Sequence, residues 1–254
     1  MSLTLEHDFG GQDTLTHSFL SNLLMTEESI LKVEKETLGQ SDNKLWFDMR
    51  RGRLTASKHH DYYTKINTIS KSHNKKGIKT TPMVADIIYE AKRISTPALN
   101  YGNEHEKDAL KVFYADQIKH HKRFSINKSG LFISKAKPFV AASPDAVMTC
   151  KCHGKSTVEI KCPYSLKDQI IDLSSAKQCP FLCVENDTIQ LNRSHKYYTQ
   201  IISQMALTKT SQSYFVVWTK SSIFVEEIKF HIGHWSRVET NLEILKFTCV
   251  LLYC

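Results

Sequence analysis

Two short stretches decide how this sequence folds, Ser143-Pro144-Asp145 and Val158-Glu159-Ile160-Lys161. The second stretch alternates apolar and charged residues, which is typical of a β-strand with one buried face. Because side chains alternate across a strand, its two charged residues point to one face and its apolar residues point into a core. Two carboxylates beside one lysine indicate a site that holds hard cations through oxygen atoms and acts on a phosphate.

Length and composition set broad limits on the class of protein. The chain has 254 residues, of which 41% are hydrophobic and 24% are charged, and these values are typical of a globular domain with a substantial core. The formal net charge of +8 favours an anionic partner, and nucleic acid is the first candidate. The length fits one large domain with additions.

The sequence contains no stretch that is long and apolar enough to cross a membrane. Residues 1–8 lack the basic start and the apolar run of a signal peptide. The seven cysteines are odd in number and irregularly spaced, which favours reduced thiols over a disulfide framework. We therefore expect an intracellular protein of the nucleus or cytoplasm, with no membrane partner.

Periodicity, capping residues and turn residues predict a mixed α/β domain. Helices are expected at 26–38, 55–63, 82–92, 97–121, 195–208 and 234–247, with a short one after Ser165. Strands are expected at 123–127, 130–134, 138–142, 146–149, 157–161, 213–219 and 222–230. The segments 67–81 and 174–194 are expected to be loops, and the lysines of the first suit contact with a nucleic-acid backbone or with solvent alone.

The helix expected from Pro97 carries one charge in an unusual place. Its stripe of Leu99, Gly102, Leu110 and Phe113 at helical spacing also includes Glu106. An unpaired buried carboxylate is costly, so Glu106 there requires a cation or hydrogen-bond donors. The alternative is that Glu106 lies at the edge of the stripe and reaches water.

The two opening stretches also have simpler interpretations. Asp145 follows a proline and is suited to stabilise a turn. Glu159 and Lys161 are suited to the polar face of a half-exposed strand. Three acids and a lysine in this order are much harder to explain by chance than any one of them.

Five segments together resemble the PD-(D/E)XK nuclease superfamily, and within it phage lambda exonuclease and the YqaJ-type viral recombinase nucleases. The resemblance spans residues 45 to about 228, and a lone Glu-x-Lys would be weak by comparison. The segments are Arg50-Arg51-Gly52-Arg53-Leu54-Thr55-Ala56-Ser57, Ala98-Leu99-Asn100-Tyr101-Gly102-Asn103-Glu104-His105-Glu106, Ser143-Pro144-Asp145, Glu159-Ile160-Lys161-Cys162-Pro163-Tyr164-Ser165 and Tyr197-Tyr198-Thr199-Gln200-Ile201-Ile202-Ser203-Gln204-Met205.

The resemblance implies a role for each matching residue. The metal ligands would be Glu106, Asp145, Glu159 and the backbone carbonyl of Ile160. Lys161 would orient the attacking water and stabilise charge on the phosphate, and Gln200 would help to position both. The contacts to DNA phosphates would come from Arg50, Ser57 and Ser143, with the arginine gripping a terminal 5′-phosphate.

The resemblance also implies a fold and an activity. The fold would be a restriction-endonuclease-like core, with a mixed central sheet flanked by helices and extra N-terminal helices. Residues 1–40 would be a lead-in and helix, 41–230 the nuclease domain, and 231–254 a C-terminal helix. The enzyme would be a deoxyribonuclease that uses one or two Mg²⁺ ions, with Mn²⁺ as a substitute. It would act 5′ to 3′ from duplex DNA ends, as a trimer.

Two other functions are compatible with the same residues. A structure-selective endonuclease would share the chemistry, because access to the site rather than the site itself separates the two. A noncatalytic DNA-binding module of nuclease descent is the third, and the intact set of acids and lysine counts against it.

Cysteines and histidines suggest a second metal. Cys150, Cys152 and His153 lie in an insert that lengthens the expected hairpin, and Cys179 and Cys183 follow later. Their spacing partly matches structural zinc sites, although free thiols are the simpler interpretation. The pairs His59-His60 and His120-His121 are expected at the surface.

Overall fold

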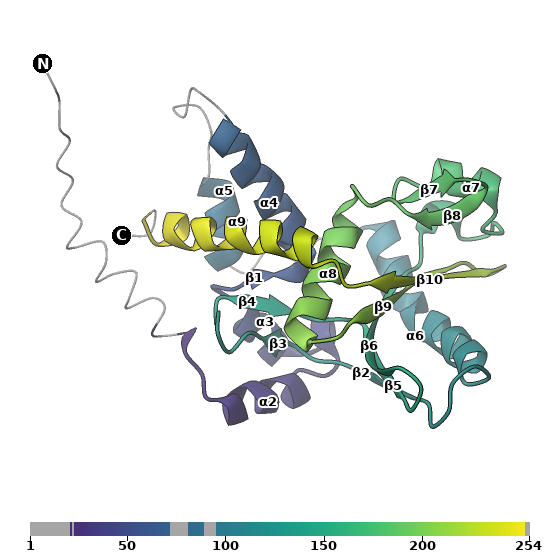
Figure 1. Cartoon of the computed structure of the whole chain (residues 1–254), viewed down its shortest axis with the longest axis horizontal. Helices are drawn as coiled ribbons and strands as arrows, with labels where there is room; N and C mark the ends of the chain where they lie inside the picture. The colour runs from purple at the N-terminus through teal and green to yellow at the C-terminus, as the bar shows by residue number, and fades with distance from the viewer. Residues whose placement is uncertain (1–20, 22, 72–80, 89–94, 252–254) are drawn as a thin grey trace, which may run out of the picture.

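The computed structural model describes residue 21 and residues 23–71, 81–88 and 95–251. In this part of the chain a mixed five-stranded sheet has helices on both faces, and further helices pack together at one side of it (Figure 1). None of the described helices is both long enough and apolar enough to cross a membrane. The expected mixed α/β architecture is confirmed.

The central sheet has the strand order β10-β9-β6-β5-β2. Strand β6 runs parallel to β9, and the other neighbouring pairs are antiparallel. The strands are β2 (Ser125–Lys128), β5 (Ala146–Cys150), β6 (Gly154–Lys161), β9 (Gln212–Trp218) and β10 (Ile223–Lys229). The strand with the Glu-Ile-Lys sequence is therefore the middle strand of the sheet.

A different helix packs against each of the two faces of β6. On one face, Val158 and Ile160 share a core with Phe113 of α6 (Pro97–Gln117). On the other face, α8 (Lys196–Thr208) shares a core with residues of β9, including Phe215. The charged residues of β6 share one face, as the alternation predicted, and that face meets α8.

A smaller sheet and the remaining helices complete the described structure. The sheet has the order β1-β4-β3, with β1 (Leu54–Thr55), β4 (Val140–Ala142) and β3 (Phe132–Ile133). The N-terminal elements are α2 (Glu27–Glu36), η1 (Gln40–Asp42) and α3 (Lys44–Arg50), followed by α4 (Ala56–Lys71) and α5 (Thr81–Ile88). Helix α9 (Ile232–Leu251) packs against α4 and α8. The domain boundaries expected at residues 40 and 230 remain predictions.

Side chains at the helix starts explain where these helices begin. Thr26 caps α2 by accepting a hydrogen bond from the backbone N–H of Ser29 at 3.1 Å. Thr96 does the same for α6 through Leu99 at 3.2 Å, and Pro97 occupies the first turn, where its missing N–H is not needed. The starts predicted near residues 26 and 97 are thus confirmed.

The prediction of a loop at 174–194 is wrong. This segment folds into α7 (Leu173–Gln178) and a hairpin of β7 (Leu182–Glu185) and β8 (Thr188–Leu191), after the short helix η3 (Tyr164–Leu166). The two residues between the strands, Asn186 and Asp187, have φ values of 49° and 55°. Asparagine and aspartate tolerate this left-handed region, which a tight hairpin turn requires. Their adjacency was the missed signal.

The prediction of a loop at 67–81 is also wrong in part. Helix α4 continues to Lys71, well beyond its expected end at Tyr63, because Ile66 and Ile69 add apolar side chains that pack against the core. Residues 72–80, which contain most of the basic segment, lie outside the described residues, as do residues 89–92 of the next expected helix.

Close packing at Gly130 leads to a test of how α2 docks on the small sheet. A Cβ atom at Gly130 would overlap the carbonyl oxygen of Glu34 and the hydroxyl of Thr37. That hydroxyl also accepts a hydrogen bond from Leu131 N at 2.8 Å. We expect Gly130→Ala to lower the free energy of unfolding by about 1–3 kcal/mol. Urea denaturation would measure the loss.

A second glycine provides the matched control. Gly102 lies within α6, and an added Cβ there would meet no atom within 4 Å. Alanine is favoured over glycine inside a helix, so Gly102→Ala should leave stability unchanged or raise it by up to about 1 kcal/mol. Equal losses in the two variants would contradict the packing described at Gly130.

Candidate active site

The side chains selected from the sequence meet in one cleft at the C-terminal end of β6. The cleft has a volume of about 780 Å³, and its walls come from α6, α8, β6 and the segment that leads into α4. Among its lining residues are all the candidates: Arg50, Ser57, Glu106, Ser143, Asp145, Glu159, Ile160, Lys161 and Gln200.

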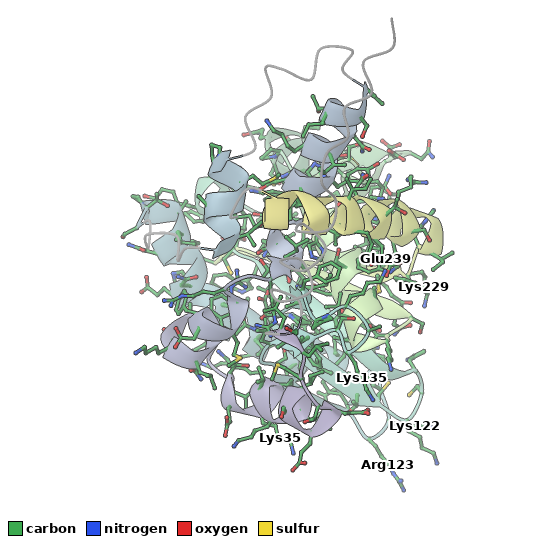
Figure 2. The ribbon with its side chains drawn as sticks, turned by 90° about the vertical axis from the view of Figure 1, so that its left-hand side faces the viewer. Lys35, Lys122, Arg123, Lys135, Lys229 and Glu239 are labelled. Atoms are coloured by element: carbon green, nitrogen blue, oxygen red, sulfur yellow. The ribbon has the colours of Figure 1, made fainter. Side chains whose placement is uncertain are left out.

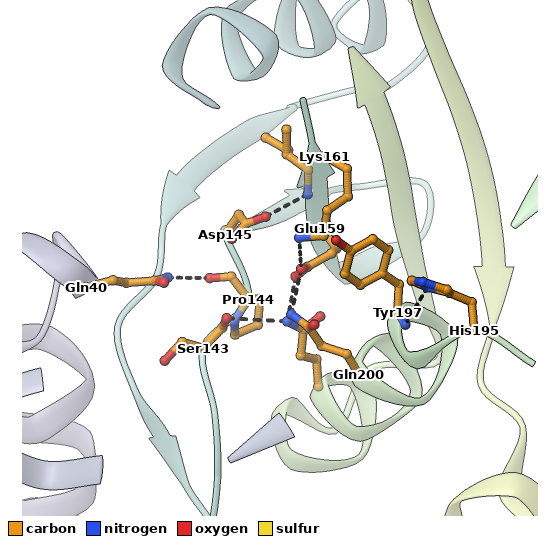
Figure 3. Close-up of polar contacts among 11 residues, drawn as sticks. Gln40, Ser143, Pro144, Asp145, Glu159, Lys161, His195, Tyr197 and Gln200 are labelled. Atoms are coloured by element: carbon orange, nitrogen blue, oxygen red, sulfur yellow. Dashed lines mark hydrogen bonds and ion pairs between the residues drawn. The ribbon is translucent and has the colours of Figure 1, made fainter. Parts of the chain in front are cut away.

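Glu159 is almost completely buried at the bottom of this cleft, with 1% of its side chain exposed. Its Oε1 atom accepts hydrogen bonds from Lys161 Nζ at 2.5 Å and from Gln200 Nε2 at 2.6 Å (Figure 3). Its Oε2 atom accepts one from Gln204 Nε2 at 2.6 Å. A buried carboxylate requires such partners, because its loss of hydration is otherwise uncompensated. Strand β6 thus supplies the charge and α8 supplies the donors.

Asp145 occupies the turn immediately before β5. Its backbone N–H donates to Val158 O at 3.1 Å, and its Oδ2 atom accepts from Ile160 N at 2.6 Å (Figure 3). These bonds place its carboxylate beside β6. Burial, followed by repulsion from Glu159, raises the pKa of Asp145 well above its usual range. The carboxylate is therefore short of positive charge.

A residue from the N-terminal part of the chain holds the turn that carries Asp145. Gln40 Nε2 donates to Pro144 O at 2.7 Å (Figure 3). It also donates to Ser129 O at 3.1 Å. Ser129 Oγ also donates to the same proline carbonyl. Sequence reasoning did not select Gln40, since nothing local marks a contact across so many residues.

Glu106 approaches the cleft from α6. It keeps 33% of its side chain exposed, and it lies 3.8 Å from Lys128 Nζ. Burial raises its pKa most strongly, Lys128 opposes the rise, and repulsion from Glu159 adds to it. Burial is thus the first cause of the raised pKa of both Glu106 and Asp145.

The buried stripe of α6 lies about one residue position away from the stripe that the sequence predicted. The buried residues of the helix are Tyr101, Ala109, Phe113 and Gln117, whereas Leu99 is 49% exposed. Glu106 therefore lies at the edge of the buried face, as the alternative interpretation proposed. Its position at this edge still directs it into the cleft.

Lys161 is the lysine of the cleft whose ammonium group contacts Glu159, and Lys107 and Lys128 also line the cleft. Its Nζ atom lies 4.8 Å from the centre of the Tyr197 ring, in addition to its contact with Glu159. Burial alone would lower the pKa of Lys161, but Glu159 and then Asp145 outweigh it and raise the pKa. Lys161 thus carries its proton at neutral pH, which favours charge stabilisation over proton abstraction.

The three carboxylates line the same cleft but do not form a tight cluster of ligand atoms. Among the described residues, the group of three or more potential metal-ligating side chains that lie close together is a different one, of histidines and cysteines, and it contains none of these carboxylates. Glu159 instead directs its oxygens to Lys161 and to the α8 amides. Like charges repel, so the three acids remain apart unless a cation joins them.

Two further residues of the cleft were missed as site residues in the sequence. Tyr197 lies against the ammonium of Lys161, and Gln204 is fully buried beside Glu159. Both project from the same face of α8 as Gln200, three residues before it and four residues after it. That spacing was the available signal, since a polar glutamine on a helix face that is otherwise buried needs a partner.

The residues predicted to bind phosphate lie at the rim of the cleft. Arg50 ends α3, stacks over the Trp46 ring at 3.9 Å and donates to Thr55 Oγ1 at 3.4 Å. Burial lowers its pKa to about 10, so it remains charged at neutral pH. Ser57 is exposed in the first turn of α4, and Ser143 Oγ accepts a hydrogen bond from Trp46 Nε1 at 2.8 Å.

The two neighbouring arginines differ in their surroundings. Arg53 is 6% exposed and donates to Pro138 O at 2.9 Å and to Met49 O at 2.7 Å. Its role is to join the small sheet to α3. Arg51 is exposed and lies 3.6 Å from Asp48.

The donor set of the cleft fits a hard divalent cation. Glu106, Asp145 and Glu159 offer carboxylate oxygens, the ligands that Mg²⁺ and Mn²⁺ prefer. Burial raises the pKa of Glu106 and of Asp145, and repulsion from Glu159 adds to both rises, so neighbouring groups do not balance the hydration that the ionised carboxylates have lost. A cation would remove that imbalance.

Comparison with known proteins gives a consistent family. The model of the YqaJ-like viral recombinase domain matches residues 45–211. The alkaline nuclease of Autographa californica nuclear polyhedrosis virus is 26% identical over 222 residues, which are 78% of this chain and 46% of the viral protein. The chain thus spans about half the length of this curated relative.

Solved structures show the same fold. An alkaline exonuclease from Laribacter hongkongensis aligns with a TM-score of 0.55 at 19% identity, covering 82% of this chain and 95% of that one. The protein of a SOX–DNA complex aligns with a TM-score of 0.53 at 14% identity, covering 94% of this chain and 74% of that one. The restriction-endonuclease-like fold expected from the sequence is confirmed.

Proposed function

The chain belongs to the YqaJ-like viral recombinase domain family, and on that premise we propose that it is a metal-dependent deoxyribonuclease that degrades duplex DNA from its ends. The observation that carries the proposal is the single cleft lined by Glu106, Asp145, Glu159 and the protonated Lys161. A relative with about twice the length of this chain is named an alkaline nuclease, and the fold is that of an alkaline exonuclease.

The metal ligands in this proposal are the carboxylates of Glu106, Asp145 and Glu159, with the Ile160 carbonyl. One or two Mg²⁺ ions, or Mn²⁺ in their place, would supply charge neutralisation at the phosphate and a water of lowered pKa. Burial and repulsion already raise the pKa of Asp145, which supports a need for cations at this position.

The protein groups orient the reacting atoms. Lys161 keeps its proton, directs the attacking water and stabilises the charge that develops on the phosphate oxygens. Gln200 and Gln204 fix the carboxylate of Glu159 through their amide donors at 2.6 Å. Tyr197 restricts the lysine side chain by covering one side of it.

The rim of the cleft accounts for the proposed preference for ends and for 5′ to 3′ polarity. Arg50 is immobilised against Trp46 and directed into the cleft, where its guanidinium would bind a terminal 5′-phosphate. Ser57, in the first turn of α4, and Ser143 would hold the next phosphates. A ring-shaped trimer around the duplex is part of the same proposal.

The test is degradation of matched DNA substrates by the full chain in the presence of Mg²⁺. Linear duplex, closed circular duplex and single-stranded DNA would be compared, with duplexes carrying either a 5′-phosphate or a 5′-hydroxyl. We expect rapid loss of linear 5′-phosphorylated duplex, no cutting of circles and no activity in EDTA. Arg50→Ala should remove the preference for the 5′-phosphate.

Three results would change the conclusion. Cutting of closed circles would replace the exonuclease with an endonuclease. Binding without cutting would leave a noncatalytic DNA-binding module. Equal rates on phosphorylated and hydroxyl ends in both the wild type and Arg50→Ala would contradict the role of Arg50 alone. Lys111→Ala, on the exposed face of α6, is the control for loss of a surface charge.

A further inference from the structure

A group of metal-ligating side chains lies apart from the cleft, where the β5–β6 hairpin turns. It consists of His121, Cys150, Cys152 and His153. Their ligand atoms all lie within 4.8 Å of one another, although His121 is distant in sequence from the other residues. The hairpin provides three members, and the segment after α6 provides the fourth.

The separations within the group match a tetrahedral zinc site. The Nδ1 atoms of His121 and His153 lie 3.3 Å apart, and Cys150 Sγ lies 3.7 Å from His153 Nδ1. With Zn–N near 2.0–2.1 Å and Zn–S near 2.3 Å, tetrahedral geometry requires about 3.3 Å between two nitrogens and about 3.6 Å between nitrogen and sulfur. We propose that these four residues bind a Zn²⁺ ion that fastens the β5–β6 hairpin to the end of α6.

The surroundings of His121 prepare its ring to bind a metal through Nδ1. Its Nε2 atom lies 3.1 Å from Gln117 Oε1, while Gln117 Nε2 donates to Asp116 Oδ2 at 3.0 Å. The carboxylate fixes which end of the glutamine amide faces the ring, so His121 Nε2 must donate and Nδ1 keeps its lone pair. This arrangement of a ligand histidine held by a hydrogen bond on its second nitrogen is usual at zinc sites.

Backbone donors prepare the two sulfurs. Cys150 Sγ accepts from His153 N at 3.2 Å, and Cys152 Sγ accepts from Lys122 N at 3.2 Å. Hydrogen bonds to sulfur favour the thiolate, which is the form that binds metal. The side chains of Lys122 and Arg123 extend away from the protein (Figure 2), so these positive charges do not occupy the site.

The position of the group indicates a structural role for the ion. Four protein ligands complete the coordination of zinc and leave no open position for a substrate. The register pairs Cys150 with Gly154 at one end of the hairpin and Ala146 with Val158 at the other, about 13 Å away at 3.3 Å per residue. Asp145 and Glu159 lie at that far end, so zinc would stabilise the hairpin that carries them.

The sequence pointed to only part of this group. Cys179 and Cys183 were considered as its partners, but Cys179 is buried in the core beside α8, and neither belongs to the group. His121 was expected at the surface and instead is half-buried between Phe124 and His153. His59 was also expected at the surface and is fully buried.

The test measures zinc bound to the purified full chain, independently of nuclease activity. Mass spectrometry of metal content should find about one zinc per chain. Cys152→Ser and His121→Asn should lower zinc affinity by at least about a hundredfold, and Gln117→Leu by about ten- to hundredfold. Titration with Co²⁺ should give a tetrahedral d–d spectrum and a thiolate charge-transfer band, which Cys152→Ser abolishes.

Two controls assign the ion to this group. Cys183→Ser removes a thiol outside the group and should leave zinc content unchanged. Asp145→Asn disrupts the carboxylate cleft and should also leave it unchanged. The proposal would be overturned by a zinc-free wild type without cobalt–thiolate absorption, by a Cys150–Cys152 disulfide in the native chain, or by zinc lost in Asp145→Asn and kept in Cys152→Ser. A Cys152→Ser variant that loses zinc but still hydrolyses DNA at the wild-type rate would support a structural zinc site that is separate from the nuclease site.

Discussion

Asp145→Asn is expected to reduce hydrolysis of linear duplex DNA by at least about a thousandfold, because removing one metal-ligand charge costs several kcal/mol of transition-state stabilisation. Asparagine keeps the shape of the side chain and an oxygen that can accept from Ile160 N, the bond seen at 2.6 Å. The loss would therefore report the missing charge rather than a misplaced turn. Initial rates with Mg²⁺ would measure it.

The same substitution should stabilise the metal-free protein. Burial and the charge of Glu159 raise the pKa of Asp145 in the folded protein. At any pH above the pKa that Asp145 has in the unfolded chain, this difference lowers the free energy of unfolding. Removing the charge should raise the midpoint of thermal unfolding in EDTA by about 2–4 °C for each kcal/mol of repulsion removed. Added Mg²⁺ should stabilise the wild type and have little effect on the variant.

Asp61→Asn is the matched control. This aspartate is exposed on α4, outside the residues that line the cleft, so neither activity nor the response to Mg²⁺ should change. An Asp145→Asn enzyme with near-normal rates, or one that is less stable in EDTA, would contradict the assignment of Asp145.

Gln204→Leu is expected to lower both activity and stability. Gln204 is fully buried, and its Nε2 atom donates to Glu159 Oε2 at 2.6 Å and to Ser143 O at 3.3 Å. Without this amide, a buried carboxylate oxygen loses its donor, which costs about 1–3 kcal/mol. Hydrolysis should fall by about ten- to hundredfold, as for other groups that orient a metal ligand.

Two measurements separate positioning from folding for Gln204. Thermal unfolding reports the stability loss, and the Mg²⁺ concentration for half-maximal rate should rise in Gln204→Leu because Glu159 is less firmly held. Gln178→Leu changes an exposed glutamine at the end of α7 and should alter neither. A variant that loses stability and keeps an unchanged Mg²⁺ requirement would show that Gln204 acts on folding alone.

The sequence was sufficient for much of the fold because local patterns and packing agree there. The alternation in Val158-Glu159-Ile160-Lys161 persists in β6, since each face meets a helix that matches it, α6 on the apolar side and α8 on the charged side. Residues that cap helices carry their own signal, as Thr26 and Thr96 show. These features depend on neighbours in the chain.

The candidate site was predictable as a set of residues and unpredictable as a geometry. The family pattern identified Glu106, Asp145, Glu159 and Lys161, and the structure gathers them around one cleft. The family pattern does not predict that Glu159 turns toward α8, because this orientation depends on where the tertiary fold places the amide donors of Gln200 and Gln204.

The features that were missed depend on contacts between distant segments. Gln40 reaches Pro144 across 104 residues, and His121 joins His153 across 32 residues. No periodicity within one segment reports such a contact. The hairpin at 182–191 was missed for a different reason, since its Asn-Asp turn was read as part of a loop and not as a tight turn.

Metal binding in the cleft is best tested by anomalous diffraction from crystals of the wild type soaked in Mn²⁺, recorded at the manganese edge. We expect at least one peak in the cleft, with carboxylate oxygens of Asp145 and Glu159 within about 2.0–2.6 Å of the ion, and with Lys161 Nζ at the margin of the site. The peak should be absent from Asp145→Asn crystals. A wild-type cleft without a peak at saturating Mn²⁺, with Glu159 still bound to Lys161, would show that these carboxylates do not bind a catalytic cation.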